Sequence, residues 1–237
     1  MTNRPTRRAA LAVSVFIVCL LRTPLVAGEG ELIFNGKNLD GWEGNRQYWS
    51  VEKGEIVGRT TAENPLKHNT FLVWRGKPLG DFELRLKYRL EGSHGNSGIQ
   101  YRSRRITEAG PFVVGGYQAD IDASLRYTGI LYDERGRGIL AERGQRVTIE
   151  PDGKRNVERF AKAAELAKVI HKDGWNSYRI VAKGPRLQHY INGTLMSEVI
   201  DRQEGKSVKE GILALQVHQG PPMVIRFKEI RLKRLKR

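Results

Sequence analysis

The sequence predicts an antiparallel β-sandwich with one short helical insertion. The chain has 237 residues and 26 glycines, many of them in turn-forming pairs such as Asn35-Gly36 and Asn192-Gly193. Between the turns, apolar residues recur at every second position, which is typical of half-buried strands. The clearest run covers residues 81–90, where the apolar set is Phe82, Leu84, Leu86, Tyr88 and Leu90. A single all-β domain commonly reaches this length.

The second half of the chain continues as a meander of hairpins. Strands are expected at 178–182, 187–191, 195–200, 213–218 and 223–232, with turns at Gly184-Pro185 and Asn192-Gly193. The segment 156–171 breaks the alternation and is rich in alanine. We therefore expect one short helix around Glu158 to Leu166.

The first 28 residues have the layout of a secretory signal peptide. Arg4, Arg7 and Arg8 precede the apolar run from Ala9 to Leu21, and the small residues Ala27 and Gly28 follow. The run is shorter than the roughly 20 apolar residues of a membrane span. We expect cleavage near residue 28, a mature domain over 29–237, a secreted or periplasmic location and no membrane association afterwards. An uncleaved N-terminal anchor is the alternative.

Cysteine and charge restrict the function further. The single cysteine, Cys19, lies in the expected signal peptide, so the mature chain would have neither disulfides nor a thiolate nucleophile. The net charge is +15, and loss of the signal's four arginines leaves 37 basic and 26 acidic residues, or +11. The basic residues are scattered, and an exported protein rarely meets nucleic acid, so we expect no nucleic-acid partner. An anionic cell-surface polymer is a further candidate partner.

Three of the expected strands each have one apolar face and one face of hydrogen-bonding side chains. Alternation places these polar residues together: Gln100 and Arg102 in the first, Gln118, Asp120 and Asp122 in the second, and Gln216 and His218 in the third. If the strands are neighbours, the residues line one groove. Amides, carboxylates and a guanidinium suit sugar hydroxyls.

Two loops add candidate residues. The glycine-bounded segment 128–137 contains Tyr132 and Glu134, and His94 stands between Gly92 and Gly95. His218 can shuttle protons near neutral pH. The other histidines, at positions 68, 171 and 189, are expected on the surface. No cofactor is required by the sequence, although Asp120, Asp122 and His218 would suit a divalent metal ion. A Gly-x-Ser-x-Gly motif is absent, which argues against a serine hydrolase.

The ordered motifs resemble the 3-keto-disaccharide hydrolase family over about residues 31–235. They include 32–42 (LIFNGKNLDGW), 49–58 (WSVEKGEIVG), 96–99 (NSGI) with Arg102, 116–122 (GYQADID), 128–132 (TGILY), 211–218 (GILALQVH) and 227–232 (FKEIRL). The resemblance implies a concanavalin A-like jelly roll that acts on glycosides oxidised at C3 of the sugar. In relatives a glutamate often stands at the position of Gln118.

For such a substrate, the resemblance implies removal of the C2 proton, elimination of the C1 oxygen and hydration, giving net glycoside hydrolysis. The expected base is Asp122 or His218, and the acid is Glu134 or His218. Arg102 or a metal ion would hold the enolate oxygen. The remaining groove residues would bind substrate: Gln100, Gln118, Asp120, Gln216, Tyr132 and His94. A carbohydrate-binding module or lectin without turnover is the main alternative, and a structural envelope protein is a weaker one.

Overall fold

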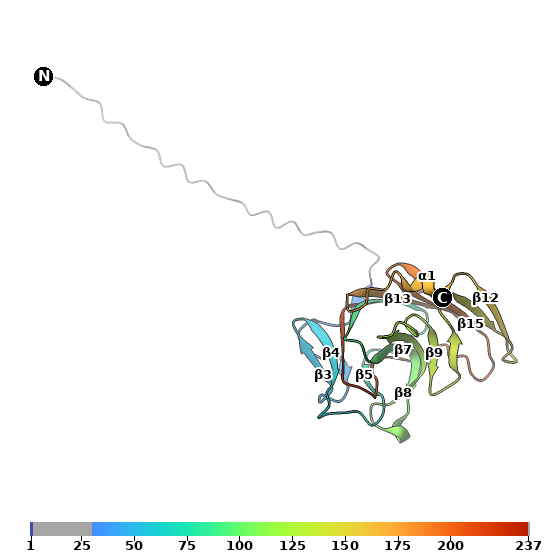
Figure 1. The fold of residues 1–237 in the computed structure, drawn as a ribbon, viewed down its shortest axis with the longest axis horizontal. Helices are drawn as coiled ribbons and strands as arrows, with labels where there is room; N and C mark the ends of the chain where they lie inside the picture. Colours follow the sequence, from blue (N-terminus) through green and yellow to red (C-terminus); the bar gives the residue numbers. More distant parts are fainter. Residues whose placement is uncertain (2–29, 237) are drawn as a thin grey trace.

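Two packed β-sheets form the body of the molecule. The computed structural model describes Met1 and residues 30–236, so the expected signal peptide lies outside the described residues. Figure 1 shows the two layers, with β13 and β15 in one sheet and β7, β8 and β9 in the other. The predicted antiparallel sandwich is confirmed.

The larger sheet has ten strands, and its neighbours are antiparallel except for β11 and β15, which run parallel. Its order is β12 (Arg155–Arg159), β11 (Gln145–Ile149), β15 (Thr194–Asp201), β14 (Arg186–Ile191), β13 (Asn176–Lys183), β6 (Phe82–Glu91), β17 (Met223–Arg234), β4 (Glu55–Thr60) and β3 (Trp49–Glu52), with β1 (Glu31–Leu32) also paired to β17.

The smaller sheet has seven strands, all joined antiparallel. Its order is β10 (Gly138–Ala141), β9 (Leu131–Glu134), β8 (Val114–Asp122), β7 (Asn96–Arg105), β16 (Ile212–Val217), β5 (Thr70–Trp74) and β2 (Trp42–Glu43). Because β7, β8 and β16 are consecutive here, the three strands with predicted polar faces are indeed neighbours.

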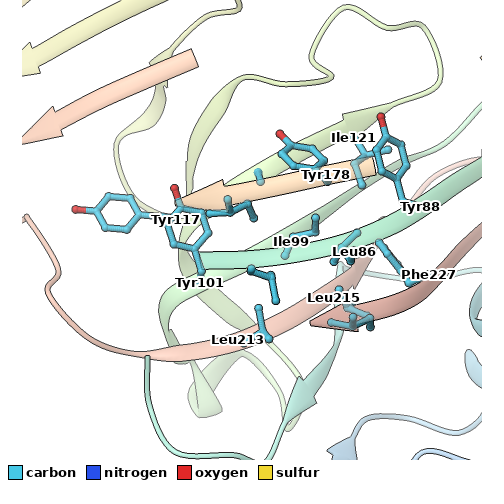
Figure 2. Close-up of a cluster of buried hydrophobic side chains, with 14 of the residues drawn as sticks. Leu86, Tyr88, Ile99, Tyr101, Tyr117, Ile121, Tyr178, Leu213, Leu215 and Phe227 are labelled. Carbon is cyan, nitrogen blue, oxygen red and sulfur yellow. The ribbon is translucent and has the colours of Figure 1, made fainter. Parts of the chain in front are cut away.

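The hydrophobic core lies between the two sheets. Figure 2 shows that both sheets contribute, with Leu86, Tyr88, Tyr178 and Phe227 from the larger sheet and Ile99, Tyr101, Tyr117, Ile121, Leu213 and Leu215 from the smaller one. Burying such a side chain completely stabilises the fold by about 1.5–3 kcal/mol. In β6 the five apolar residues predicted from the alternation are all buried, whereas the residues between them are partly or fully exposed.

His189 belongs to this core, so the expectation of a surface position is wrong. The side chain is 0% exposed, and its Nε2 lies 2.8 Å from the hydroxyl of Tyr101. Its Nδ1 lies 3.1 Å from the carbonyl oxygen of Ile130, which can only accept, so Nδ1 is the protonated nitrogen. Burial lowers the pKa of His189 to about 3, which keeps the ring neutral.

The helical insertion starts later than predicted. The helix α1 covers Ala163–Ala167, whereas residues 155–159 form the edge strand β12. Pairing with β11 supplies the backbone of 155–159 with hydrogen bonds and overrides its local preference. A 3-10 turn covers Thr107–Ala109. No helix within residues 30–236 has the length and apolar character needed to cross a membrane.

Hairpin geometry follows the predicted turns. Lys183 and Arg186 bracket the Gly184-Pro185 turn between β13 and β14. Asn192 and Gly193 have φ values of 49° and 82°, as a tight hairpin turn with two left-handed residues requires. These turns join β13, β14 and β15 as consecutive antiparallel neighbours in the larger sheet.

Candidate functional site

A cavity of about 270 Å³ lies on the outer face of the smaller sheet, and we call it the carboxylate cavity. In β8, Tyr117, Ala119 and Ile121 enter the core, so Gln118 and Asp120 face away from it. Strand β9 pairs Tyr132 with Gln118, which brings Tyr132 and Glu134 to the same face. The lining residues are Asn96, Gln118, Asp120, Tyr127, Ile130, Tyr132, Glu134, Ile139 and His218.

A chain of buried hydrogen bonds holds Asp120. Gln118 donates from Nε2 to Oδ1 of Asp120 at 3.0 Å and accepts from Nε2 of Gln100 at 2.6 Å. Gln100 in turn accepts from the hydroxyl of Ser103 at 2.8 Å. Each acceptor fixes the orientation of the next amide, so the carboxyl of Asp120 is held in one direction.

Burial makes Asp120 a weak acid. The side chain is 6% exposed, and desolvation raises its pKa to about 8. The negative charges of Asp122 and Glu134 add to this increase, while the hydrogen bond from Gln118 opposes it. At neutral pH most Asp120 carboxyls therefore carry a proton and can donate a hydrogen bond into the cavity.

Glu134 and His218 form the second part of the site. Burial raises the pKa of Glu134, and the nearby charge of His218 opposes that shift. Asn69 donates to Oε1 of Glu134 at 3.2 Å and accepts from the backbone nitrogen of Gln219 at 3.0 Å. Asn69 thus ties the glutamate to the loop that carries the histidine.

The ring orientation of His218 is set by its neighbour along the chain. Nδ1 makes a short hydrogen bond to the carbonyl oxygen of Gln219, so Nδ1 donates. His218 lies at the end of β16 and is partly exposed. Its Nε2 has no hydrogen-bond partner among residues 30–236 and is available to a ligand in the cavity.

Five predicted site residues lie together in the carboxylate cavity: Gln118, Asp120, Tyr132, Glu134 and His218. Gln100 lies behind Gln118 and acts on the cavity only through it. Gln216 does not line the cavity. It is 0% exposed, and among the described residues neither its amide nitrogen nor its amide oxygen has a hydrogen-bond partner.

Arg102 is elsewhere, so the expected sharing of a face with Gln100 is wrong. The pairing of β7 with β8 shifts register between Tyr101 and Arg104, and Arg102 has a φ of 45°. The side chain is therefore redirected. Its guanidinium donates to the carbonyl oxygens of Gly80 and Gly184 at 2.9 and 2.8 Å and pairs with Asp81 at 3.0 Å.

Asp122 and His94 also lie outside the cavity lining. The Oδ2 atom of Asp122 accepts from the hydroxyl of Ser124 and from the backbone nitrogens of Arg126 and Tyr127, which closes the turn after β8. His94 is exposed in its loop. Asp122, one of the two expected bases, and His94, the expected loop ligand, are thus not brought to the site, whereas His218, the other expected base, is.

The metal ligands suggested by the sequence are not assembled either. Asp120 and His218 line the cavity while Asp122 closes its turn. Within residues 30–236, no group of three or more histidine, cysteine, aspartate or glutamate side chains could hold a metal ion.

Sequence reasoning missed several residues of the site. Asn96 shares the polar face of β7 with Gln100, so the same alternation would have found it. Tyr127, Ile130 and Asn69 come from irregular segments, where side-chain direction has no fixed period. No sequence signal indicates that Asn69 reaches Glu134, 65 positions away along the chain.

Comparison with known structures shows the fold. A carbohydrate-binding module CBM66 from Bacillus subtilis has a TM-score of 0.54 at 14% identity, covering 81% of this chain and 95% of its own. A putative glycosyl hydrolase from Parabacteroides distasonis has a TM-score of 0.57 at 22% identity, covering 88% and 95%. The β-glucanase of Bacillus licheniformis has a TM-score of 0.51 at 10% identity, covering 88% and 100%. The expected jelly-roll architecture is confirmed by these neighbours.

Comparison of the sequence identifies the family. No curated protein matches the chain significantly. The profile of the 3-keto-alpha-glucoside-1,2-lyase-like domain matches residues 29–233. The match covers nearly the whole length and includes the strands that carry Asp120, Glu134 and His218. The chain is a carbohydrate-active protein that belongs to the 3-keto-α-glucoside-1,2-lyase-like family.

Proposed function

We propose that the protein cleaves 3-keto-glycosides by elimination across C1 and C2, followed by hydration. The observation that carries the proposal is the carboxylate cavity, where Asp120 is protonated at neutral pH beside a second carboxyl, Glu134, and a histidine, His218. A protonated carboxyl beside a second carboxyl and an imidazole suits chemistry that must supply an acid and a base together. Family membership supports the choice of substrate.

The chemistry needs three groups. The ketone at C3 acidifies the hydrogen on C2, and a base removes it, so the C2–H electrons form an enolate with its charge on the C3 oxygen. The enolate then re-forms the ketone, a C1=C2 double bond appears, and the C1–O bond breaks. The leaving oxygen takes a proton. Water adding across the double bond, with OH at C1 and a proton at C2, completes net hydrolysis.

Each step has a candidate group in the cavity. Glu134 is the base, because its carboxyl lines the cavity and Asn69 holds it in place. Asp120 in its protonated form donates to the C3 oxygen as negative charge develops there. His218 in its imidazolium form supplies the leaving-group proton from Nε2, since Nδ1 donates its own proton to Gln219. Asn96 and Tyr132 can hydrogen-bond the sugar hydroxyls.

The direct test is release of the aglycone from a 3-keto-glucoside. Glu134→Gln keeps the size of the side chain and the contact with Asn69 but removes the base. We expect turnover to fall by about a hundredfold or more, the typical contribution of a positioned base. Glu108→Gln, at an exposed glutamate outside the cavity, is the matched control and should behave as wild type.

Two results would contradict the proposal. Full activity in Glu134→Gln would exclude the glutamate as base. Binding of the 3-keto-glucoside by wild type with no release of aglycone would make the protein a binding module instead.

Export is a second part of the proposal. The N-terminal layout of Arg4, Arg7 and Arg8 before an apolar run supports a cleaved signal peptide. N-terminal sequencing of the protein from the periplasm and culture fluid should give a start near Ala27 or Gly28. A mature protein that retains residues 1–28 would contradict export by this route.

A further inference from the structure

A second cavity of about 330 Å³ adjoins the carboxylate cavity, and we call it the arginine cavity. Tyr127, Ile130 and Ile139 line both cavities. The other lining residues are Arg126, Glu142, Arg143 and Ala163. A ligand that extends past the three shared residues would therefore occupy both spaces.

Arg143 is the unusual member of this lining. Its side chain is held by three carbonyl oxygens, with Nε donating to Ala163 at 2.9 Å and Nη1 donating to Leu125 and Thr128 at 2.7 Å each. The residue is 7% exposed. Within residues 30–236, its Nη2 has no hydrogen-bond partner and no carboxylate oxygen lies within 4.0 Å of its guanidinium.

Two other arginines, the buried Arg102 and the half-buried Arg137, do have counter-ions. Arg102 pairs with Asp81 at 3.0 Å, and Arg137 pairs with Asp133 and Asp201 at 2.7 Å each. A buried charge is costly unless an opposite charge compensates for it. For Arg143 the compensation comes from carbonyl dipoles and from the more distant Asp122, and burial still lowers its pKa. The guanidinium is thus rigidly placed, cationic and incompletely paired.

A second cation stands at the same cavity. Arg126 is exposed, and its guanidinium lies over the ring of Tyr127 at 5.1 Å without an ion pair among the described residues. The one carboxylate of the lining, Glu142, is also exposed and receives a hydrogen bond from Gln145 at 3.3 Å. The lining therefore has an excess of positive charge, with one buried and one exposed guanidinium.

We propose that the arginine cavity binds an anionic group, such as a carboxylate, sulfate or phosphate, on the leaving part of the substrate. The placement rests on the proposed function, because C1–O cleavage needs a group on the C1 oxygen and the arginine cavity adjoins the space for the keto sugar. The Nη2 of Arg143 can donate to one oxygen of such a group, and the exposed guanidinium of Arg126 can donate to another. The preferred substrates are then 3-keto-glycosides with an acidic aglycone.

A matched substrate pair tests this preference. The 3-keto-glucosides of 4-hydroxybenzoate and 4-hydroxybenzamide share their shape and differ in charge. We expect kcat/KM to be about tenfold higher for the carboxylate, and the ratio to fall as salt is added. Sulfonate and phosphonate analogues then identify the preferred anion.

Variants locate the effect. Arg126→Gln removes the exposed guanidinium and should reduce the ratio of kcat/KM between the two substrates towards one. Arg75→Gln, at an exposed arginine outside both cavities, is the control and should leave the ratio unchanged. Arg143→Gln should also abolish the preference for the carboxylate substrate. Arg126→Gln is nevertheless the decisive variant, because Arg143 also holds three backbone carbonyls in place and its loss could disturb the fold.

The outcome is separable from that of the proposed function. Calorimetric affinities for the two unoxidised glucosides report on the anion site even if neither 3-keto compound is cleaved. Tighter binding of the benzoate that Arg126→Gln abolishes would support the arginine cavity by itself. Equal kcat/KM values, or equal affinities where there is no turnover, would overturn the proposal and leave the carboxylate cavity to be judged on its own test.

Discussion

Asp120 has the most strongly shifted pKa among the residues of the site. Its neighbours Gln118 and Gln100 are buried with it, so water solvates the ionised form poorly. The position was predicted from strand alternation, because Gln118 and Asp120 stand two residues apart on one face. Its protonation could not be predicted, since that depends on how the neighbouring strands bury the carboxyl.

Replacing Asp120 by asparagine should change how stability depends on pH. The folded-state pKa of about 8 lies above the ordinary value of 3.8. Between these values the unfolded chain is ionised while the folded protein keeps its proton, so wild-type stability falls as pH rises from about 4 to 8. Asp120→Asn lacks this loss and should gain about 4 kcal/mol relative to wild type between pH 5 and pH 9.

Chemical denaturation at pH 5, 7 and 9 measures the effect. Asp40→Asn, at an exposed carboxylate, is the control for a simple change of charge. If the stability difference between Asp120→Asn and wild type stayed constant across this range, the buried and protonated carboxyl would be ruled out.

At the scale of elements, the bulge in β7 accounts for the main error in the predicted site. Regular alternation placed Gln100 and Arg102 on one face, but the register shift after Tyr101 sends Arg102 to Asp81 instead. A bulge adds a residue to one strand without a strong local signal, so it is not visible in a periodic pattern. Asp122 was misplaced for a similar reason, since β8 ends there and its carboxylate closes a turn.

Arg102→Gln should therefore affect stability and leave the chemistry intact. The variant leaves Asp81 without its cation and removes hydrogen bonds to Gly80 and Gly184. Breaking one side of a buried ion pair costs about 3 kcal/mol. At a temperature where the variant is folded, its kcat on a 3-keto-glucoside should match that of wild type.

Thermal unfolding and steady-state kinetics on the same preparation check both parts. Lys77→Gln, at an exposed position, is the control for loss of a surface cation. A folded Arg102→Gln protein with a kcat reduced a hundredfold would show instead that Arg102 takes part in catalysis.

At the scale of the whole molecule, the sandwich could be predicted because its signals are repeated along the chain. Alternating strands, glycine turns and hairpin spacing recur from residue 31 to 232, so a local error such as the late start of α1 does not alter the architecture. The site lacks this redundancy. Asp120, Glu134 and His218 come from three strands or strand ends, and only the pairing of β7, β8, β9 and β16 decides that they meet.

In the proposed mechanism, Glu134 of this assembled site removes the proton on C2 of the sugar. The most direct measurement is a single turnover of a 3-keto-glucoside in D₂O, quenched early, with the C2 isotope of the product read by mass spectrometry. An enzyme-free sample of 3-keto-glucose corrects for spontaneous exchange. We expect deuterium at C2 of the product, because the eliminated intermediate carries no hydrogen on C2 and the carboxyl proton of Glu134 exchanges with D₂O before water adds. Release of the aglycone with the original C2 hydrogen retained would contradict it.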